Sequence, residues 1–290
     1  MDSNGTVAAI VVTHNRIEQL RKCLRLLAEQ TRHPDETLVF DNVSDDGTAE
    51  FLAGLNTRVS VLRPTRNVGG AGGFHLAIAE AWKRGHDWFW LMDDDSAPTA
   101  DALERLLEPL SDLDPTPLVL ASRVLWSGDR SLHPMNQPLP SLDRSALVRG
   151  ACTGLMPLRA SSFVSCLLHR SAVDRYGLPN RNYFVWNDDL EYTARVLRHE
   201  HGYWVPASVV FHETPSPHRT GSADPSKFYF EVRNKLLMLR GEAWRPLERP
   251  AWVKALAVHT IGFLRLHRFS AEALSAVGRG VRDGLFGRVR

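Results

Sequence analysis

The chain has 290 residues, of which 43% are hydrophobic, so it is long enough to bury a sizeable core. That length suits one large domain, or one domain with an extension. The net charge of +2 does not favour a protein that binds nucleic acid. The three cysteines, Cys23, Cys152 and Cys166, form no CxxC pair, which indicates a reducing compartment and disfavours disulfides or a cysteine zinc site.

The segment 1–16 lacks a basic stretch followed by an apolar core and a cleavage site, so we expect no signal peptide. No run of about 18 uncharged apolar residues occurs, and we therefore expect no transmembrane helix. The expected location is the cytoplasm.

Short apolar runs alternate with helical patterns in the first part of the chain. Strands are expected at 7–12, 37–40, 59–64 and 88–92, and helices at 17–27, 44–55, 74–84 and 99–110. This alternation indicates βαβ units, and therefore an α/β protein with a mostly parallel central sheet flanked by helices.

The middle of the chain is less regular. The expected elements there are a loop at 127–144, a strand at 162–169, a helix at 187–202 and an extended segment at 203–212. The helix is expected to be capped by Asn187 or Asp188. The extended segment is expected to end at His212.

The last part of the chain is basic. Residues 227–290 hold 13 Lys and Arg against 5 Asp and Glu, a net charge of +8, whereas residues 1–226 carry −6. We expect 1–226 to form one domain and 227–290 a mainly helical extension with breaks at Pro246 and Pro250. The extension, whose segment 251–269 is apolar on one face, either lies against anionic lipid or forms a solvated helical surface packed on the first domain.

Polar clusters follow three of the four expected strands, at Thr13–Arg16, Asp41–Asn42 and Asp93–Asp95. In open parallel sheets, ligands bind beyond the carboxyl ends of the strands. Because residues two apart in extended chain point the same way, Asp93 and Asp95 are expected to converge. Two such carboxylates suit Mg²⁺ or Mn²⁺, and the alternative is a solvated acidic turn that caps the next helix.

Two further motifs are candidates for binding and catalysis. The glycines of "RNVGGAGGF", Gly69, Gly70, Gly72 and Gly73, either let a phosphate approach the backbone or pack a helix closely on a strand. Their spacing matches neither GxGxxG nor a P-loop. In "WNDDLEY", one acid is either a general base or part of the negative charge at a helix start. His212 is either a metal ligand or a structural residue.

The ordered set "VVTHNR", "FDNVSDDGT", "RNVGGAGGF", "WFWLMDDD", "YFVWNDDLEYTARVLRHEHGY" and "VVFHE" resembles inverting family-2 glycosyltransferases of the GT-A fold. The resemblance covers 6–240. "RNVGGAGGF" followed by "DWFWLMDDD" is most similar to bacterial cell-wall galactofuranosyltransferases. "FYFEVRNKLLMLR" (228–240) is also similar to segments of bacterial rhamnosyltransferases.

The resemblance implies roles for individual positions. The implied donor-binding residues are Thr13, Asn15, Arg16, Asp41, Asn67, Gly69, Gly70, Asp93 and Asp94. The implied metal ligands are Asp93, Asp95 and His212, with Mn²⁺ or Mg²⁺ as the cofactor. Asp189 matches the catalytic base, and Trp186 and Asp188 match the acceptor site. Asn187 is a departure, because relatives often place Trp or Gly immediately before the acidic pair.

The implied reaction is a metal-dependent single displacement that moves galactofuranose from UDP-galactofuranose onto a polyprenyl-diphosphate-linked glycan. A dTDP-rhamnose-dependent rhamnosyltransferase is the alternative within the family. The implied setting is the inner face of the cell membrane, with the basic extension as a peripheral anchor. A metal-dependent nucleotidyltransferase and a non-catalytic nucleotide-sugar-binding module remain as other classes.

Overall fold

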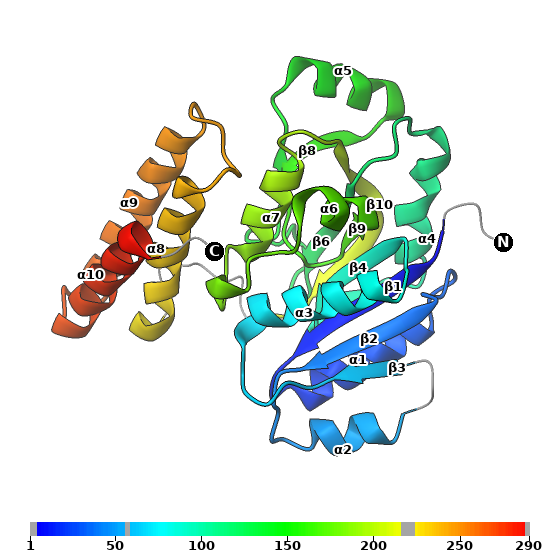
Figure 1. The fold of residues 1–290 in the computed structure, drawn as a ribbon, viewed down its shortest axis with the longest axis horizontal. Helices are drawn as coiled ribbons and strands as arrows, with labels where there is room; N and C mark the ends of the chain where they lie inside the picture. The colour runs from blue at the N-terminus through cyan, green and yellow to red at the C-terminus, as the bar shows by residue number, and fades with distance from the viewer. Residues whose placement is uncertain (1–4, 56–58, 216–223, 288–290) are drawn as a thin grey trace.

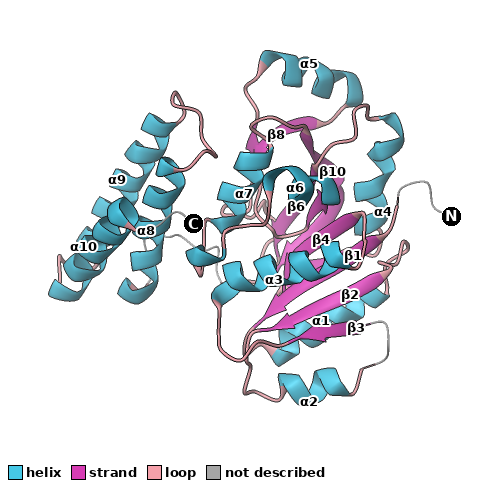
Figure 2. Cartoon of the chain, viewed as in Figure 1, coloured by secondary structure: helices cyan, strands magenta, loops and turns pink. Residues whose placement is uncertain are grey.

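One central sheet organises the computed structural model, which describes residues 5–55, 59–215 and 224–287. The strands follow the order β3-β2-β1-β4-β9-β6-β10-β8-β7, and β5 pairs with β10 (Figure 1). Helices flank the sheet, and three helices at the C-terminal end form a separate bundle beside it (Figure 2). The expected α/β class and the expected C-terminal helical part are therefore confirmed.

The first half of the sheet is parallel. Its strands are β1 (Val7–Thr13), β2 (Glu36–Asp41), β3 (Val59–Leu62) and β4 (Trp88–Asp93). Helix α1 (Ile17–Ala28) packs on Val7, Ala9 and Val11 of β1, and α3 (Gly69–Lys83) packs with Ala8, Ile10 and Val12. Alternate side chains of one buried strand thus face two different helices, which explains its unbroken apolar run.

The second half of the sheet is mixed. Strand β9 (Cys166–His169) runs antiparallel between β4 and β6 (Val119–Trp126), and β10 (Gly202–His212) runs parallel to β6. The remaining strands are β5 (Ser96–Pro98), β7 (Leu139–Pro140) and β8 (Met156–Ala160). The remaining helices of this part are α2 (Thr48–Ala53), α4 (Ala102–Leu107), α5 (Arg144–Thr153), α6 (Arg170–Tyr176) and α7 (Asp188–Val196), with short 3-10 turns at Glu108–Asp112 and Arg181–Tyr183.

Several expected boundaries were wrong. The helix expected at 74–84 begins at Gly69, because the glycines form its first turns. The strand expected at 162–169 is limited to Cys166–His169, and the helix expected at 187–202 ends at Val196. Helix α5 and strand β8 were not predicted, because neither has a long apolar period.

The C-terminal bundle consists of α8 (Pro225–Arg240), α9 (Arg249–Leu266) and α10 (Ala271–Phe286). The rings of Phe228 and Phe263 stack with centroids 3.8 Å apart, which joins α8 to α9. Pro246 lies between these helices as expected, but Pro250 falls in the first turn of α9, where a missing N–H costs nothing. Among the described residues, no helix is both long and apolar enough to cross a bilayer.

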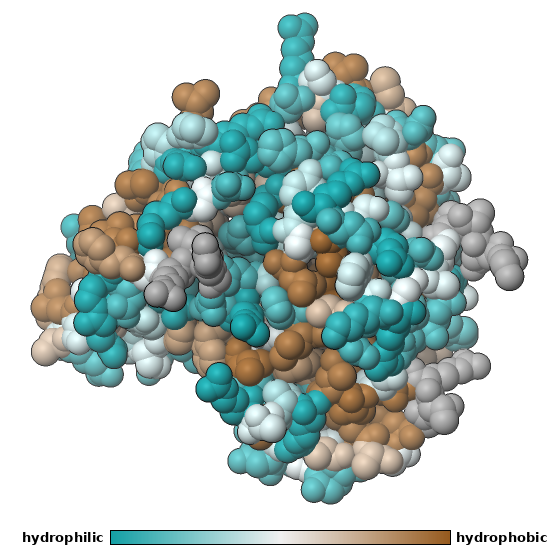
Figure 3. Space-filling view, viewed as in Figure 1, coloured by the Kyte–Doolittle hydropathy of each residue, from teal (hydrophilic) through white to brown (hydrophobic). Residues whose placement is uncertain are grey.

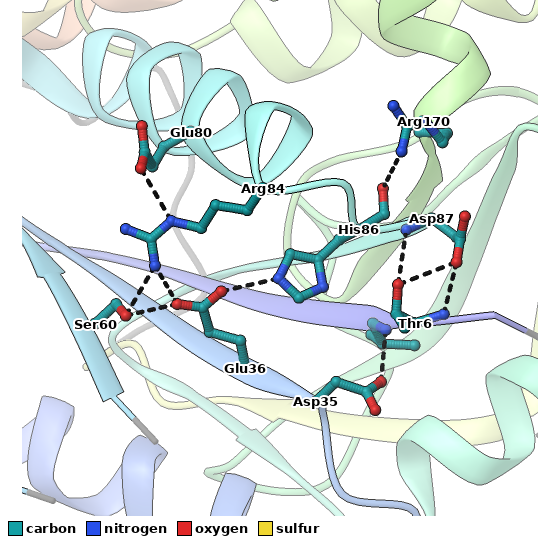
Figure 4. Close-up of polar contacts among 10 residues, drawn as sticks. Thr6, Asp35, Glu36, Ser60, Glu80, Arg84, His86, Asp87 and Arg170 are labelled. Atoms are coloured by element: carbon teal, nitrogen blue, oxygen red, sulfur yellow. Dashed lines mark hydrogen bonds and ion pairs between the residues drawn. The ribbon is translucent and has the colours of Figure 1, made fainter. Parts of the chain in front are cut away.

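A network of polar contacts joins the N-terminal ends of the parallel strands, at the sheet edge opposite the polar clusters (Figure 4). Glu36 at the start of β2 accepts hydrogen bonds from Arg84 and Ser60 and lies 2.8 Å from Nε2 of His86. Asp87 accepts from the backbone N–H of Thr6 at 2.8 Å. These contacts hold the N-terminal ends of β1 to β4 together. They therefore help to fix the positions of the C-terminal ends of these strands relative to one another.

Candidate functional site

The sheet brings the predicted polar clusters to one edge. In the parallel register, Thr13 lies opposite Asp41 on one side of β1, and Val12 lies opposite Asp93 on the other. The three clusters therefore meet where β1, β2 and β4 end. Thr13 and Asp41 are both buried.

Asp93, Asp95 and His212 form a group whose possible ligand atoms all lie within 4.8 Å of one another. His212 reaches the group because the last residues of β10 pair with β5, which directly follows the aspartates, and His212 lies opposite Ser96. Asp94 and Asp95 are buried, so the triple aspartate is not a solvated acidic turn.

The orientation of His212 fits a cation between its ring and Asp95. Its Nδ1 lies 2.9 Å from Oδ1 of Asn136 and donates to it, which turns Nε2 toward Oδ1 of Asp95, also at 2.9 Å. A lone pair on Nε2 would repel that carboxylate, so a proton or a metal ion must lie between them. The oxygen and imidazole donors of this group suit Mn²⁺, and Mg²⁺ through the carboxylates.

Opposite electrostatic effects act on the three aspartates. Burial opposes ionisation of Asp95, but His212 and Arg16 outweigh it and lower the pKa of Asp95 to about 2. Burial and the charge of Asp95 raise the pKa of Asp93 to about 6 and that of Asp94 to about 7. Such a concentration of negative charge favours binding of a cation at this edge.

Arg16 is a further cation at the edge, and it contacts the acids directly. Its Nη1 lies 2.5 Å from Oδ2 of Asp95 and 3.5 Å from Oδ1 of Asp94. The guanidinium is about half exposed, so it lies between the buried acids and solvent. Arg16 is thus placed to reach a phosphate that enters the site.

The predicted nucleotide side contains a residue that the sequence did not single out. Arg63, directly after β3, forms an ion pair with the fully buried Asp41 and donates to the carbonyl of Ser44 at 2.7 Å. Ser44 in turn accepts from the backbone N–H of Asn15 at 2.9 Å. The predicted strand 59–64 included Arg63, so the sequence did not indicate that Arg63 follows the end of a strand.

Asn67 and the glycines lie at the start of α3. Oδ1 of Asn67 accepts from Asn42 at 2.9 Å and from the N–H of Gly69 at 2.8 Å. Gly69 has a φ of 74°, and a Cβ there would lie 2.1 Å from the carbonyl oxygen of Phe184. A Cβ on Gly70 would meet nothing within 4 Å. Close packing therefore explains Gly69, whereas Gly70 faces open space.

Asp188 and Asp189 begin α7, and the charge of each interacts with that of Asp93 or is affected by it. Burial raises the pKa of Asp189 to about 6, although its carboxylate accepts from the N–H of Leu190 at 2.7 Å. Burial and the neighbouring Asp189 raise the pKa of Asp188 well above its ordinary value. The charge of Asp189 also contributes to the raised pKa of Asp93, so these two carboxylates lie close enough for their charges to interact.

The residues before these acids adopt unusual backbone. Trp186 and Asn187 have φ values of 63° and 65°. Asn187 occupies the N-cap position of α7 as expected, but its side chain makes no capping hydrogen bond and donates instead to Glu231 at 3.0 Å. The position of Trp186 beside the acids is compatible with its implied place in an acceptor site.

Comparison with known proteins identifies the family. The model for glycosyl transferase family 2 matches residues 8–176. The chain belongs to this family. It is 32% identical over 267 residues to galactofuranosyltransferase GlfT1 of Mycobacterium tuberculosis, covering 86% of this chain and 87% of that protein. It is 30% identical over 273 residues to GlfT1 of Mycolicibacterium smegmatis, covering 88% and 89%.

Solved structures support the fold. Staphylococcus aureus TarS superposes with a TM-score of 0.65 at 14% identity, covering 96% of this chain and 49% of that one. A complex of TarS residues 1–349 with UDP-GlcNAc gives 0.64 at 15% identity, covering 98% and 82%. GalNAc-T7 with UDP, GalNAc and Mn²⁺ gives 0.59 at 14% identity, covering 89% and 55%. The GT-A-like fold and glycosyltransferase activity expected from the sequence are therefore confirmed.

Proposed function

We propose that this glycosyltransferase moves galactofuranose from UDP-galactofuranose onto a lipid-linked glycan, with inversion at the anomeric carbon. The observation that carries the proposal is that Asp189 lies close enough to Asp93 for their charges to interact, while Asp93 forms one group with Asp95 and His212. The similarity to the two GlfT1 proteins supports the choice of sugar. A nucleotide-binding module without catalysis would have no need for a partly buried carboxylate at Asp189.

In this proposal the donor and the acceptor meet at the carboxyl ends of the strands. Thr13, Asn15, Asp41 and Asn67 bind the nucleotide, Arg16 and Gly70 line the donor phosphates, and Asp94 belongs to the same donor site. Trp186 and Asp188 line the acceptor site. Residues 1–226 supply these groups as the catalytic domain, and residues 227–290 form a C-terminal extension.

Asp189 is the proposed general base. Its raised pKa makes it a stronger base than an ordinary aspartate, yet leaves it mostly ionised at neutral pH. It takes the proton of the acceptor hydroxyl as that oxygen attacks the anomeric carbon, and the bond to the nucleoside diphosphate breaks. A divalent ion held by Asp93, Asp95 and His212 would neutralise charge on the diphosphate leaving group.

Asp189→Asn tests the base directly. We expect transfer to fall on the order of 10²- to 10⁴-fold, with UDP affinity retained, because the amide keeps the shape but accepts no proton. Glu191→Gln is a matched control, because Glu191 lies on the same helix but pairs with Arg195 at 2.8 Å. Full transfer by Asp189→Asn would remove this residue from the mechanism.

The metal is tested by binding as well as by activity. EDTA is expected to abolish transfer, and Mn²⁺ or Mg²⁺ to restore it. Mn²⁺ should also raise the melting temperature of the parent protein, and Asp95→Asn should lose that increase. An enzyme indifferent to EDTA, with no metal-dependent stabilisation, would contradict the assignment.

A donor panel tests the sugar and the reaction class. With Mn²⁺ present, UDP-galactofuranose should be turned over faster than UDP-galactopyranose or dTDP-rhamnose, with release of a nucleoside diphosphate. Preference for dTDP-rhamnose would make the protein a rhamnosyltransferase. Release of pyrophosphate would make it a nucleotidyltransferase.

The proposed acceptor is a polyprenyl-diphosphate-linked glycan, and the proposed location of the enzyme is the inner face of the cell membrane. The net charge of +8 on residues 227–290 supports attachment to anionic lipid. Exposed apolar side chains on the helical bundle also support it, and hydrophobic residues lie among hydrophilic ones on that bundle (Figure 3).

A further inference from the structure

The loop that precedes the α7 acids is held in a conformation that its own residues disfavour. We define residues 183–187 as the acceptor loop. Within it Phe184, Trp186 and Asn187 all have positive φ, at 66°, 63° and 65°. Bulky residues rarely adopt such backbone, and it persists only where the surroundings determine it. The contacts that hold this loop are therefore candidates for a functional role.

Asn234 of α8 makes the central contact. Its side-chain Nδ2 lies 3.0, 2.7 and 2.9 Å from the carbonyl oxygens of Tyr183, Val185 and Trp186. The residue is fully buried. One side-chain amide thus donates hydrogen bonds to three backbone carbonyls of a loop that lies about fifty positions earlier in the chain. Because buried carbonyls need donors, no apolar residue can replace it.

The neighbours of Asn234 extend this contact along the loop. Nη2 of Arg233 donates to the carbonyl of Tyr183 at 2.8 Å and to that of Asn182 at 2.7 Å. One turn earlier on α8, Oε2 of the buried Glu231 accepts from Nδ2 of Asn187 at 3.0 Å. Asn187 directly precedes Asp188 and Asp189, so Glu231 fixes the point at which α7 begins.

The other side of the loop is held by the glycine segment. The carbonyl of Phe184 accepts from the N–H of Ala71 at 3.1 Å, and Gly69 leaves room for that close approach. The acceptor loop is therefore clamped between α3, which lies at the donor side, and α8, which lies outside the predicted catalytic domain 1–226 for most of its length.

We infer that Asn234 and Glu231 are positioning residues that set the acceptor loop and the start of α7, and thereby place Trp186 and Asp189 for transfer. This inference rests on the proposed function, since it assigns those two residues to acceptor and base. It makes α8 part of the transfer machinery. Loss of either residue should impair the chemical step and acceptor use more than donor binding.

Asn234→Ala is the direct test, and Tyr229→Phe is its control. Tyr229 lies on the same helix, but its hydroxyl donates to Asp283 of α10 at 2.8 Å and not to the loop. We expect transfer by Asn234→Ala to fall about 10- to 100-fold, as for displaced catalytic groups, with UDP affinity within about twofold of the parent. Tyr229→Phe should retain parent transfer.

Glu231→Gln and Glu231→Ala provide a second, independent pair. Gln keeps an oxygen that can accept from Asn187, so it should retain more transfer than Ala. Equal transfer by Asn234→Ala and the parent would overturn the inference. An equal loss of UDP affinity and transfer would also overturn it, because that pattern indicates general unfolding.

Hydrogen exchange separates this inference from the proposed function. In Asn234→Ala, the amides of residues 184–191 should exchange faster, whereas those of β1 should not change. This result is expected even if the parent transfers a different sugar or none. Unchanged exchange over 184–191 would overturn the positioning role, whereas absence of transfer by the parent would overturn only the proposed function.

Discussion

Gly69 and Gly70 are adjacent, yet the structure gives them different tasks. Gly69 has a positive φ, and the carbonyl oxygen of Phe184 occupies the space that a side chain at this position would need. A Cβ on Gly70 would meet no neighbour. Gly69→Ala should therefore destabilise the protein by more than about 1 kcal/mol. Gly70→Ala should keep or raise the melting temperature, because Ala favours the helix, but should weaken donor binding. Thermal melts and UDP titration of both variants check this pair.

The pKa of Asp189 predicts an acid limit to transfer. Burial raises this pKa to about 6, so the base is ionised above that pH and becomes protonated below it. With metal in excess, kcat should fall about tenfold per pH unit below about pH 6. The check is a kcat profile, with circular dichroism at each pH to confirm folding. A flat profile across that range would contradict the assignment of the base.

Single residues could be predicted where they follow a recognisable strand. The acids at Asp93–Asp95 and at Asp188–Asp189 stand out in the sequence, and the structure brings the two groups close enough for their charges to interact. Asn136, Arg63 and Asn234 could not be found in this way. Each acts through a partner distant in sequence, such as the 76 positions between Asn136 and His212, and no local pattern marks such a pair.

At the scale of elements, the junction of α8 with α7 contains a buried carboxylate, which gives the fold an acid-sensitive point. Burial opposes ionisation of Glu231, but His259, Lys235 and Asn187 outweigh it and lower its pKa to about 2. Because the folded pKa lies below the ordinary value of 4.5, the stabilisation is present above about pH 4.5 and is lost as the pH falls toward 2.

Glu231→Gln tests this linkage. The variant should lose on the order of 3 kcal/mol of unfolding free energy at neutral pH. Between about pH 4.5 and 2 its stability should decline less steeply than that of the parent, because the titrating group is gone. Urea unfolding at a series of pH values measures both effects. Parallel stability curves for the two proteins would show that Glu231 does not titrate with folding.

Elements with a clear period were predicted, and those without one were missed. The alternating strands and helices of 7–93 follow from apolar runs of the right length. A strand was expected at 162–169, but its antiparallel pairing between β4 and β6 was not, because pairing direction depends on contacts far apart in the chain. The early start of α3 was missed because glycine is a poor helix former, whereas here Phe184, Val68 and Val12 leave no room for a side chain at three of the glycines.

At the scale of the whole molecule, the segment after α8 is joined to α7 through Arg159 of β8. Arg159 of β8 donates to the carbonyl of Ala194 at 2.6 Å, at the end of α7, and forms an ion pair with Glu248 at 2.7 Å. Its guanidinium also lies over the ring of Trp244, 4.6 Å from the centroid. Residues 225–248 are thus joined to both ends of α7, whereas α9 and α10 extend away from the sheet (Figure 1).

The outer helices are therefore the part of the molecule in which membrane attachment can be tested without disturbing the site. On α10, Leu274, Val281 and Leu285 are 49%, 39% and 44% exposed and recur at helical spacing. Arg279 and Arg282 lie between them in sequence, and each well-placed cation adds about 1 kcal/mol of attraction to an anionic surface. We expect the protein to float with phosphatidylglycerol vesicles, less with phosphatidylcholine vesicles, and to be released by salt.

Changing Leu274, Val281 and Leu285 together to Ser should reduce flotation by about tenfold or more, because each side chain buried in the membrane contributes about 1.5–3 kcal/mol. Leu142→Ser is the matched control, because Leu142 is 86% exposed but lies before α5, outside the bundle. Transfer to a water-soluble acceptor should be unchanged in both variants, since α10 lies outside the proposed site. Equal flotation by the triple variant and the parent would place the membrane contact elsewhere, and equal binding to neutral vesicles would remove the role of charge.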